Sequence, residues 1–165
     1  MKKTCLKEQH IWSLLRFALG GIFLWPFFDK LLGLGFSTAA DKSWLAGGSP
    51  TYGFLKMGTS GPLAGFYQSI AGNPITDTLF MLALLMIGLA LILGIGLKIA
   101  GYSGALLTLY MWSAVLPPKQ NPILDEHIVF MIIFMAFTFV KAGQCWGLGK
   151  WWSNTKLVKK FPILE

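Results

Sequence analysis

The most reactive-looking stretch of the sequence joins two acidic residues to a histidine. Asp125 and Glu126 are followed directly by His127, which is one of only two histidines in the chain. A histidine titrates near neutral pH, and a neighbouring carboxylate can tune that titration. These residue types in this order therefore predict a catalytic proton relay of Asp125, Glu126 and His127. The alternative is a helix start with acidic residues in its first turn, which applies most strongly to Asp125.

Other ionisable residues lie inside an apolar run. Asp29 and Lys30 come near one end of it and Arg16 near the other. Charged groups inside a membrane are costly and often mark functional sites. The alternative for Lys30 is an ion pair with Asp125 or Glu126, which would still gather these residues around one outer cavity. Lys30 could also attract a small anion, and Arg16 could extend back to the headgroups.

Tryptophans near these charges could stack on a flat ligand. The alternative is a belt of aromatic rings at the membrane surface. We expect a pocket for a substrate or a flat ligand, formed by Asp29, Lys30, Arg16, Trp25, Trp44 and Trp112.

The composition is unlike that of a soluble domain. Hydrophobic residues make up 55% of the chain, charged residues make up 13%, and the mean hydropathy is +0.61. These values predict that the lipid bilayer is the main partner. The net charge of +7 is spread over both ends, without the aromatic and basic interleaving of a nucleic-acid surface, so no nucleic acid is expected.

Four apolar stretches are long enough to cross a membrane as helices. They cover about 11–36, 76–97, 99–116 and 122–146. We therefore expect residues 1–165 to form a single all-α membrane domain, a four-helix bundle. The first stretch resembles a signal peptide, but it is too long and is interrupted by charges, so a retained span is expected. Residues 37–72 would form an external lid with short helices, and residues 147–165 a cytoplasmic basic tail.

The distribution of lysines predicts the orientation. Both termini are expected in the cytoplasm and the protein in the plasma membrane as a multi-pass protein. The lysines on the cytoplasmic side would be Lys2, Lys3, Lys7, Lys98, Lys141, Lys150, Lys156, Lys159 and Lys160, against Lys30, Lys42, Lys56 and Lys119 outside.

A short motif occurs twice. Residues 73–77 and 121–125 both read N-P-I-x-D. Asn suits the N-cap of a helix, Pro its first position and Asp its first turn. The motif therefore predicts a helix start at each site. Cys5 and Cys145 stand alone without zinc spacing, so neither a disulfide framework, a metal nor a covalent cofactor is expected.

Several motifs together resemble the DoxX family of small four-span membrane proteins, especially members similar to the DoxD subunit of thiosulfate:quinone oxidoreductases. The resemblance runs from Arg16 to about Leu164. It rests on LRFALGGIFLWPFFDK (15–30), WLAGGSP (44–50), GLALILG (88–94), NPILDEH (121–127) and WGLGKWW (146–152). Two features depart from the family: residues 84–87 lack a glutamate that many relatives carry, and Phe130 stands where close relatives often have tyrosine.

The resemblance implies a quinone-linked oxidoreductase subunit that acts on a small reduced sulfur compound, with quinone as cofactor and a second subunit as partner. A homo-oligomer is a further expectation. The alternatives are a membrane anchor or assembly partner without chemistry, and a small-molecule transporter. A disulfide-forming quinone reductase would need cysteine pairs on the oxidising side, and both cysteines are expected in the cytoplasm.

Overall fold

The computed structural model describes residues 7–118 and 121–165, and this part of the chain is helical without strands. The expected all-α class is confirmed. The α-helices are α1 (Lys7–Leu32), α2 (Ala64–Ser69), α3 (Pro74–Leu93), α4 (Leu97–Ala114), α5 (Glu126–Phe139), α6 (Gly149–Trp152) and α7 (Lys156–Lys160). Shorter helical turns cover Ala40–Lys42, Phe54–Gly58, Gly61–Leu63, Ala142–Gln144 and Pro162–Leu164.

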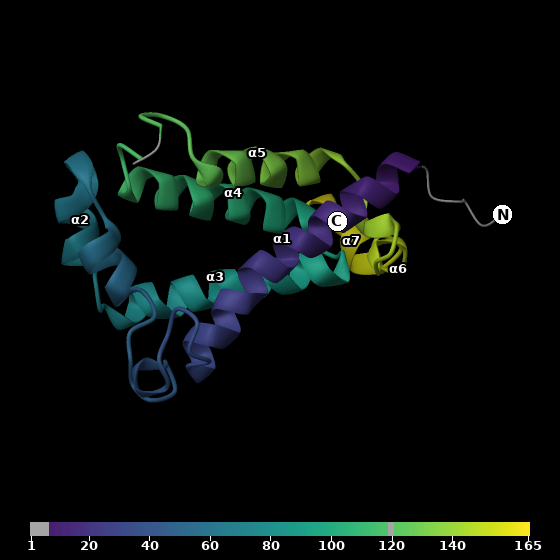
Figure 1. Ribbon diagram of the computed structural model, residues 1–165. Helices are drawn as coiled ribbons and strands as arrows, with labels where there is room; N and C mark the ends of the chain where they lie inside the picture. Colours follow the sequence, from purple (N-terminus) through teal and green to yellow (C-terminus); the bar gives the residue numbers. More distant parts are fainter. Residues whose placement is uncertain (1–6, 119–120) are drawn as a thin grey trace.

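The four long helices form two pairs. α1 packs along α3, and α4 packs along α5. α3 and α4 meet at a tight turn and diverge from it, and α2 lies across the wide end of the resulting V (Figure 1). Buried residues of all four helices share one core, to which Leu19, Phe23, Met81, Leu84, Ile87, Leu91, Leu97, Ala105, Phe134 and Phe137 contribute. The fold thus has a closed end at the α3–α4 turn and an open end covered by the lid.

The two N-P-I-x-D motifs behave differently. At the first, the Asn73 side chain accepts a hydrogen bond from the amide of Ile75, and α3 begins at Pro74 as expected. At the second, Asn121 makes the same kind of bond with Ile123, but α5 begins only at Glu126. Asp125 is its N-cap, so the predicted helix start at 121–122 is four residues early.

Membrane crossing is supported for part of the bundle. Within the described residues, α1 and α3 are long and apolar enough to span a bilayer, whereas α5 is a shorter apolar helix of 14 residues. At about 1.5 Å per residue such a helix falls short of the roughly 30 Å hydrocarbon core. Large apolar side chains nevertheless remain exposed on all four long helices, as on Leu14 (57%), Met86 (63%), Leu106 (50%) and Ile132 (60%).

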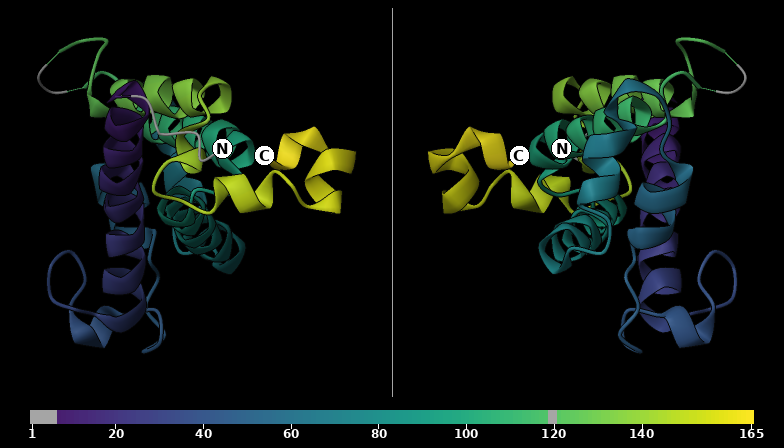
Figure 2. Two further views of the ribbon diagram at one scale, coloured as in Figure 1. Left: turned by 90° about the vertical axis from the view of Figure 1, so that its right-hand side faces the viewer. Right: turned by 90° about the vertical axis from the view of Figure 1, so that its left-hand side faces the viewer.

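The C-terminal elements lie at the closed end, opposite the lid (Figure 1), and project to the side away from α1 (Figure 2). The Trp152 indole donates a hydrogen bond to the carbonyl oxygen of Leu164 at 2.5 Å, which folds this segment back on itself.

Cys145 is 1% exposed and disulfide-bonded, contrary to the expectation of no disulfide. The chain's other cysteine, Cys5, lies outside the described residues, as do Lys2, Lys3 and Lys119.

Candidate functional site

A large apolar pocket lies between α3 and α4 beneath the lid. Its volume is about 410 Å³, within the range of small-molecule sites, which are mostly apolar with a few polar groups. The lid contributes Pro50, Thr51, Phe54, Leu55, Phe66, Tyr67 and Ile70; α3 contributes Thr76, Leu79, Phe80 and Ala83; α4 contributes Leu107, Tyr110, Met111 and Ala114; and α1 contributes Lys30.

Lys30 supplies the only charge among the residues that line this pocket. Across the described ranges, its ammonium group makes no hydrogen bond and no ion pair within 4 Å. A cation beside apolar walls favours a ligand that carries an acceptor or negative charge. The pocket is therefore mostly apolar and has one positively charged corner.

The lid is fastened to both helices that form the V. On the α3 side, Asp77 is 5% exposed and accepts hydrogen bonds from the Ser49 hydroxyl at 2.9 Å and from the amide and hydroxyl of Thr51 at 3.1 and 2.5 Å. On the α4 side, the hydroxyl groups of Tyr67 and Ser113 lie 2.5 Å apart. Leu55, Tyr67 and Ala114 form a small second core there. These contacts fix the roof of the pocket.

Asp29 is adjacent to Lys30 in sequence but serves a different purpose. Its carboxylate is 1% exposed and accepts hydrogen bonds from the amides of Phe36 and Ser37 at 3.2 and 2.9 Å and from the Ser37 hydroxyl at 2.6 Å. It holds the turn after α1 and does not line the pocket. The predicted pairing of Lys30 with Asp125 or Glu126 is not formed.

The three predicted relay residues lie at the start of α5. His127 Nδ1 is 2.8 Å from Asp125 Oδ2, while Asp125 Oδ1 accepts the amide hydrogen bond of His127 at 3.0 Å. The two side chains are 14% and 10% exposed, whereas Glu126 is exposed. None of them lines the lid pocket. Lys30 lines the lid pocket and His127 does not, and the end of α1 and the start of α5 lie on different sides of the fold (Figures 1 and 2).

Arg16 lies in the N-terminal half of α1, away from Lys30. The two are fourteen residues apart (30 − 16), or about 21 Å along a helix. Arg16 is fully buried, and its guanidinium donates to the carbonyl oxygens of Leu91, of Ile92 at 2.7 Å and of Trp146 at 2.8 Å. It therefore points inward rather than toward the surface, and it does not line the lid pocket.

The three predicted pocket tryptophans also lie outside the lining. Trp25 is 47% exposed and packs edge-on against Phe36. Trp44 packs against the main core. The Trp112 indole donates to the carbonyl oxygen of Ile123 at 2.8 Å and so supports the loop before α5. Of the six predicted pocket residues, only Lys30 lines the pocket.

Sequence reasoning missed the apolar wall residues of α3 and α4. α3 is apolar all round, so its sequence cannot tell the pocket face from the lipid face. The lid did carry a signal, because Phe66, Tyr67 and Ile70 share one face of a short helical pattern. Two polar residues that anchor the lid, Ser49 and Thr51, carried no such signal in the sequence.

No family model, curated protein or solved structure matches the chain. The resemblance to the DoxX family therefore stays a prediction. Within residues 7–118 and 121–165, no group of three or more histidine, cysteine, aspartate or glutamate side chains is placed to hold a metal ion.

Proposed function

We propose that the chain is a DoxX-like, multi-pass membrane protein that binds a quinone beneath its lid and serves as the membrane subunit of a quinone-linked oxidoreductase. The single observation that carries the proposal is the 410 Å³ apolar pocket with Lys30 at one corner. A quinone ring would lie against Phe80 and Tyr110, and its carbonyl oxygen would accept a hydrogen bond from Lys30. The proposal follows the resemblance in taking a small reduced sulfur compound as substrate and a second subunit as partner.

The route into this pocket would lead from the bilayer. α3 and α4 are farthest apart where the lid crosses them (Figure 1), and both carry exposed apolar side chains, such as Leu79 (63%) and Leu106 (50%). An isoprenoid tail could remain between the helices while the ring reaches Lys30. The proposal includes all four long helices in the membrane, with α4 and α5 completing their crossings with flanking residues.

The test is photolabelling of the purified full chain with a photoreactive benzoquinone analogue. Labelled peptides should come from the lid, α3 and α4. Ala83→Phe fills the pocket and should reduce labelling by about tenfold or more, since it removes the space for the ring. Ala18→Phe, on the exposed face of α1, is the matched control. Equal labelling of both variants would contradict the quinone site.

Activity is tested in membranes that contain the chain and its native partners. Thiosulfate-dependent quinone reduction should fall with Ala83→Phe and with Lys30→Gln, and remain with Lys56→Gln, an exposed lid lysine. His127→Ala tests the predicted relay separately. If it abolishes turnover but leaves labelling intact, His127 moves protons; if it changes neither, the Asp125–His127 pair is structural.

A second candidate function is a membrane anchor without chemistry. It is favoured by the hydrogen bonds that engage Asp29, Asp77 and Asp125 in holding turns and helix ends. The anchor function requires normal partner assembly with Ala83→Phe, and it requires that no quinone probe binds. The two candidates therefore give opposite results in the labelling experiment.

We also propose that both termini face the cytoplasm of a cell whose plasma membrane holds the protein, because lysines are more numerous at the closed end. The disulfide at Cys145 is a contrary indication, since disulfides are typical of oxidising compartments. Labelling of Asn154→Cys and Lys56→Cys in intact cells with a membrane-impermeant maleimide decides the matter. Modification of the lid position alone supports the proposed orientation; modification of the tail position alone reverses it.

A further inference from the structure

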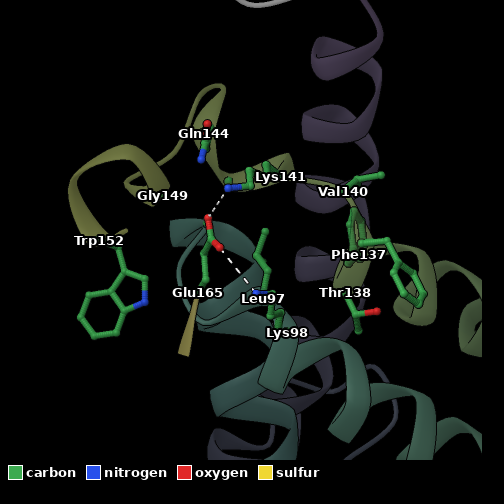
Figure 3. Close-up of a pocket in the computed structure, with 13 residues that line it drawn as sticks. Leu97, Lys98, Phe137, Thr138, Val140, Lys141, Gln144, Gly149, Trp152 and Glu165 are labelled. Atoms are coloured by element: carbon green, nitrogen blue, oxygen red, sulfur yellow. Dashed lines mark ion pairs between the residues drawn. The ribbon is translucent and has the colours of Figure 1, made fainter. Parts of the chain in front are cut away.

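A second hollow lies at the closed end of the fold. Its volume is about 160 Å³, and its polar lining consists of Lys98, Lys141, Gln144, Thr138 and Glu165. Figure 3 shows the Glu165 carboxylate between the two lysine side chains. Oε2 of Glu165 is 3.5 Å from Lys98 Nζ, and Oε1 is 3.0 Å from Lys141 Nζ. Two cations, one in α4 and one in the segment just after α5, thus converge on one anionic group.

The start of α4 strengthens the positive field in this hollow. Gly96 is the N-cap of the helix and has no side chain with which to cap it. The amide of Lys98 instead donates to the main-chain oxygen of Glu165 at 3.0 Å. Amide groups at a helix start carry partial positive charge and favour anions. The Glu165 residue thus occupies a position that suits an anion, and the three charged side chains together retain one positive charge.

An apolar groove adjoins this hollow. It has a volume of about 340 Å³ and runs between α3 and α4 along Met86, Leu89, Leu93, Ile99 and Ser103. Trp152 lines both the polar hollow and the groove, and Leu164 of the groove precedes Glu165 of the hollow. A polar hollow with excess positive charge therefore shares a wall with a groove that could hold a hydrocarbon chain.

We propose that this pair of hollows is a binding site for one anionic phospholipid, with its phosphate at Lys98 and Lys141 and an acyl chain in the groove beside Trp152. A phosphodiester carries one negative charge and neutralises the charge that Glu165 leaves uncompensated. The inference rests on the proposed membrane location but not on the quinone site, which lies at the other end of the fold. The site would fasten the α3–α4 turn to the bilayer.

The experiment counts lipids bound to the detergent-purified full chain by native mass spectrometry, during titration with phosphatidylglycerol or with phosphatidylcholine of the same acyl chains. The first phosphatidylglycerol molecule should bind more tightly than those that follow, which gives a separate tight step in the titration. Phosphatidylcholine should show no tight step. Glycerol phosphate at the same concentrations is a soluble control that carries the phosphate without acyl chains. If it binds as tightly as the lipid, the site accepts a free anion and the lipid assignment is wrong.

Charge variants test the proposed phosphate position at Lys98 and Lys141. The double variant Lys98→Gln/Lys141→Gln should weaken the tight step by about 25-fold, since each lysine near an anionic lipid is worth about 1 kcal/mol, or fivefold. Lys156→Gln/Lys159→Gln removes the same charge from exposed tail positions and is the matched control. An equal loss in both double variants would mean general attraction to the surface and would overturn the proposal.

Two further variants avoid loss of the lysines. Glu165→Gln keeps the main-chain oxygen that caps α4 but removes a charge that repels phosphate, so it should tighten lipid binding by about fivefold. Ser103→Phe, at an exposed position of the groove, should weaken binding of the two-chain lipid and leave binding of glycerol phosphate unchanged. Unchanged lipid affinity in both variants would refute the site.

Discussion

Thr51 is bonded twice to Asp77, since its amide and its hydroxyl donate to the same carboxylate oxygen at 3.1 and 2.5 Å. This relationship joins the lid to the first turn of α3, and the Ser49 hydroxyl adds a third bond. All three bonds of the lid to α3 described here end on this carboxylate. Asp77 therefore serves as the lid's anchor on α3.

Asp77→Ala should release the lid and lower the free energy of unfolding by about 3 kcal/mol, because hydrogen bonds to a buried charge are lost. Hydrogen exchange of residues 49–70 should accelerate more than that of α5. Asp41→Ala removes an exposed carboxylate from the same lid segment and should change stability by less than about 0.5 kcal/mol. Similar exchange rates in the two variants would contradict the role of Asp77.

Arg16→Leu should destabilise the bundle by about 3 kcal/mol, since the buried carbonyl oxygen of Leu91 and the part-buried ones of Ile92 and Trp146 lose their donor. Arg16→Lys keeps the charge but has a compact head that cannot reach three acceptors, so an intermediate loss is expected. Thermal unfolding in detergent provides the measurement. Lys7→Gln, at an exposed position of the same helix, is the control.

Close packing of α4 on α5 depends on glycines. A Cβ at Gly104 would lie 2.5 Å from Cδ1 of Phe134, and one at Gly101 would lie 2.7 Å from the Phe134 carbonyl oxygen. Gly104→Ala should therefore cost about 1–3 kcal/mol through overpacking. Gly21→Ala meets nothing within 4 Å and should stabilise α1 by about 0.5–1 kcal/mol. Chemical unfolding of both variants would show whether their effects have opposite signs.

The stability of the closed end should depend on pH through Glu165. Burial acts to raise the pKa of its carboxyl group, but hydrogen bonds and charges from Lys141 and Lys98 hold this pKa below its ordinary value of 4.5. The carboxylate therefore contributes stability above about pH 4.5, and this contribution is lost as the pH falls through the lower folded pKa. The melting temperature measured from pH 7 to pH 3 should fall less in Glu165→Gln than in the unchanged chain.

The sequence predicted where helices begin better than it predicted which helices pack together. Asn73, Pro74 and Asp77 act locally, so the start of α3 was foreseeable from residue types alone. The same motif at 121–125 did not begin a helix, although Asn121 accepts amide hydrogen bonds from Ile123 and Leu124. The helix begins after the next cap, Asp125, which accepts those of His127 and Ile128. Local patterns thus indicate that a helix start is near but do not choose between two adjacent caps.

The candidate site depended on long-range packing that no local pattern encodes. Lys30 and His127 were expected together because both lie at outer helix ends. In the fold, α1 pairs with α3 and α5 pairs with α4, and the two pairs diverge toward the lid (Figure 1). Charge and hydropathy predict which residues are near one membrane surface, but the pairing of helices determines which of them meet.

The arrangement around Arg16 also bears on how the protein is made. The guanidinium is in the first helix, yet its acceptors belong to residues 91, 92 and 146. During synthesis from the N-terminus, α1 emerges long before these carbonyl groups exist. In the proposed membrane location, its charge would then be hydrated or held by the insertion machinery until the last third of the chain has been translated. α1 should therefore enter the bilayer poorly on its own, and the C-terminal segment should complete its insertion.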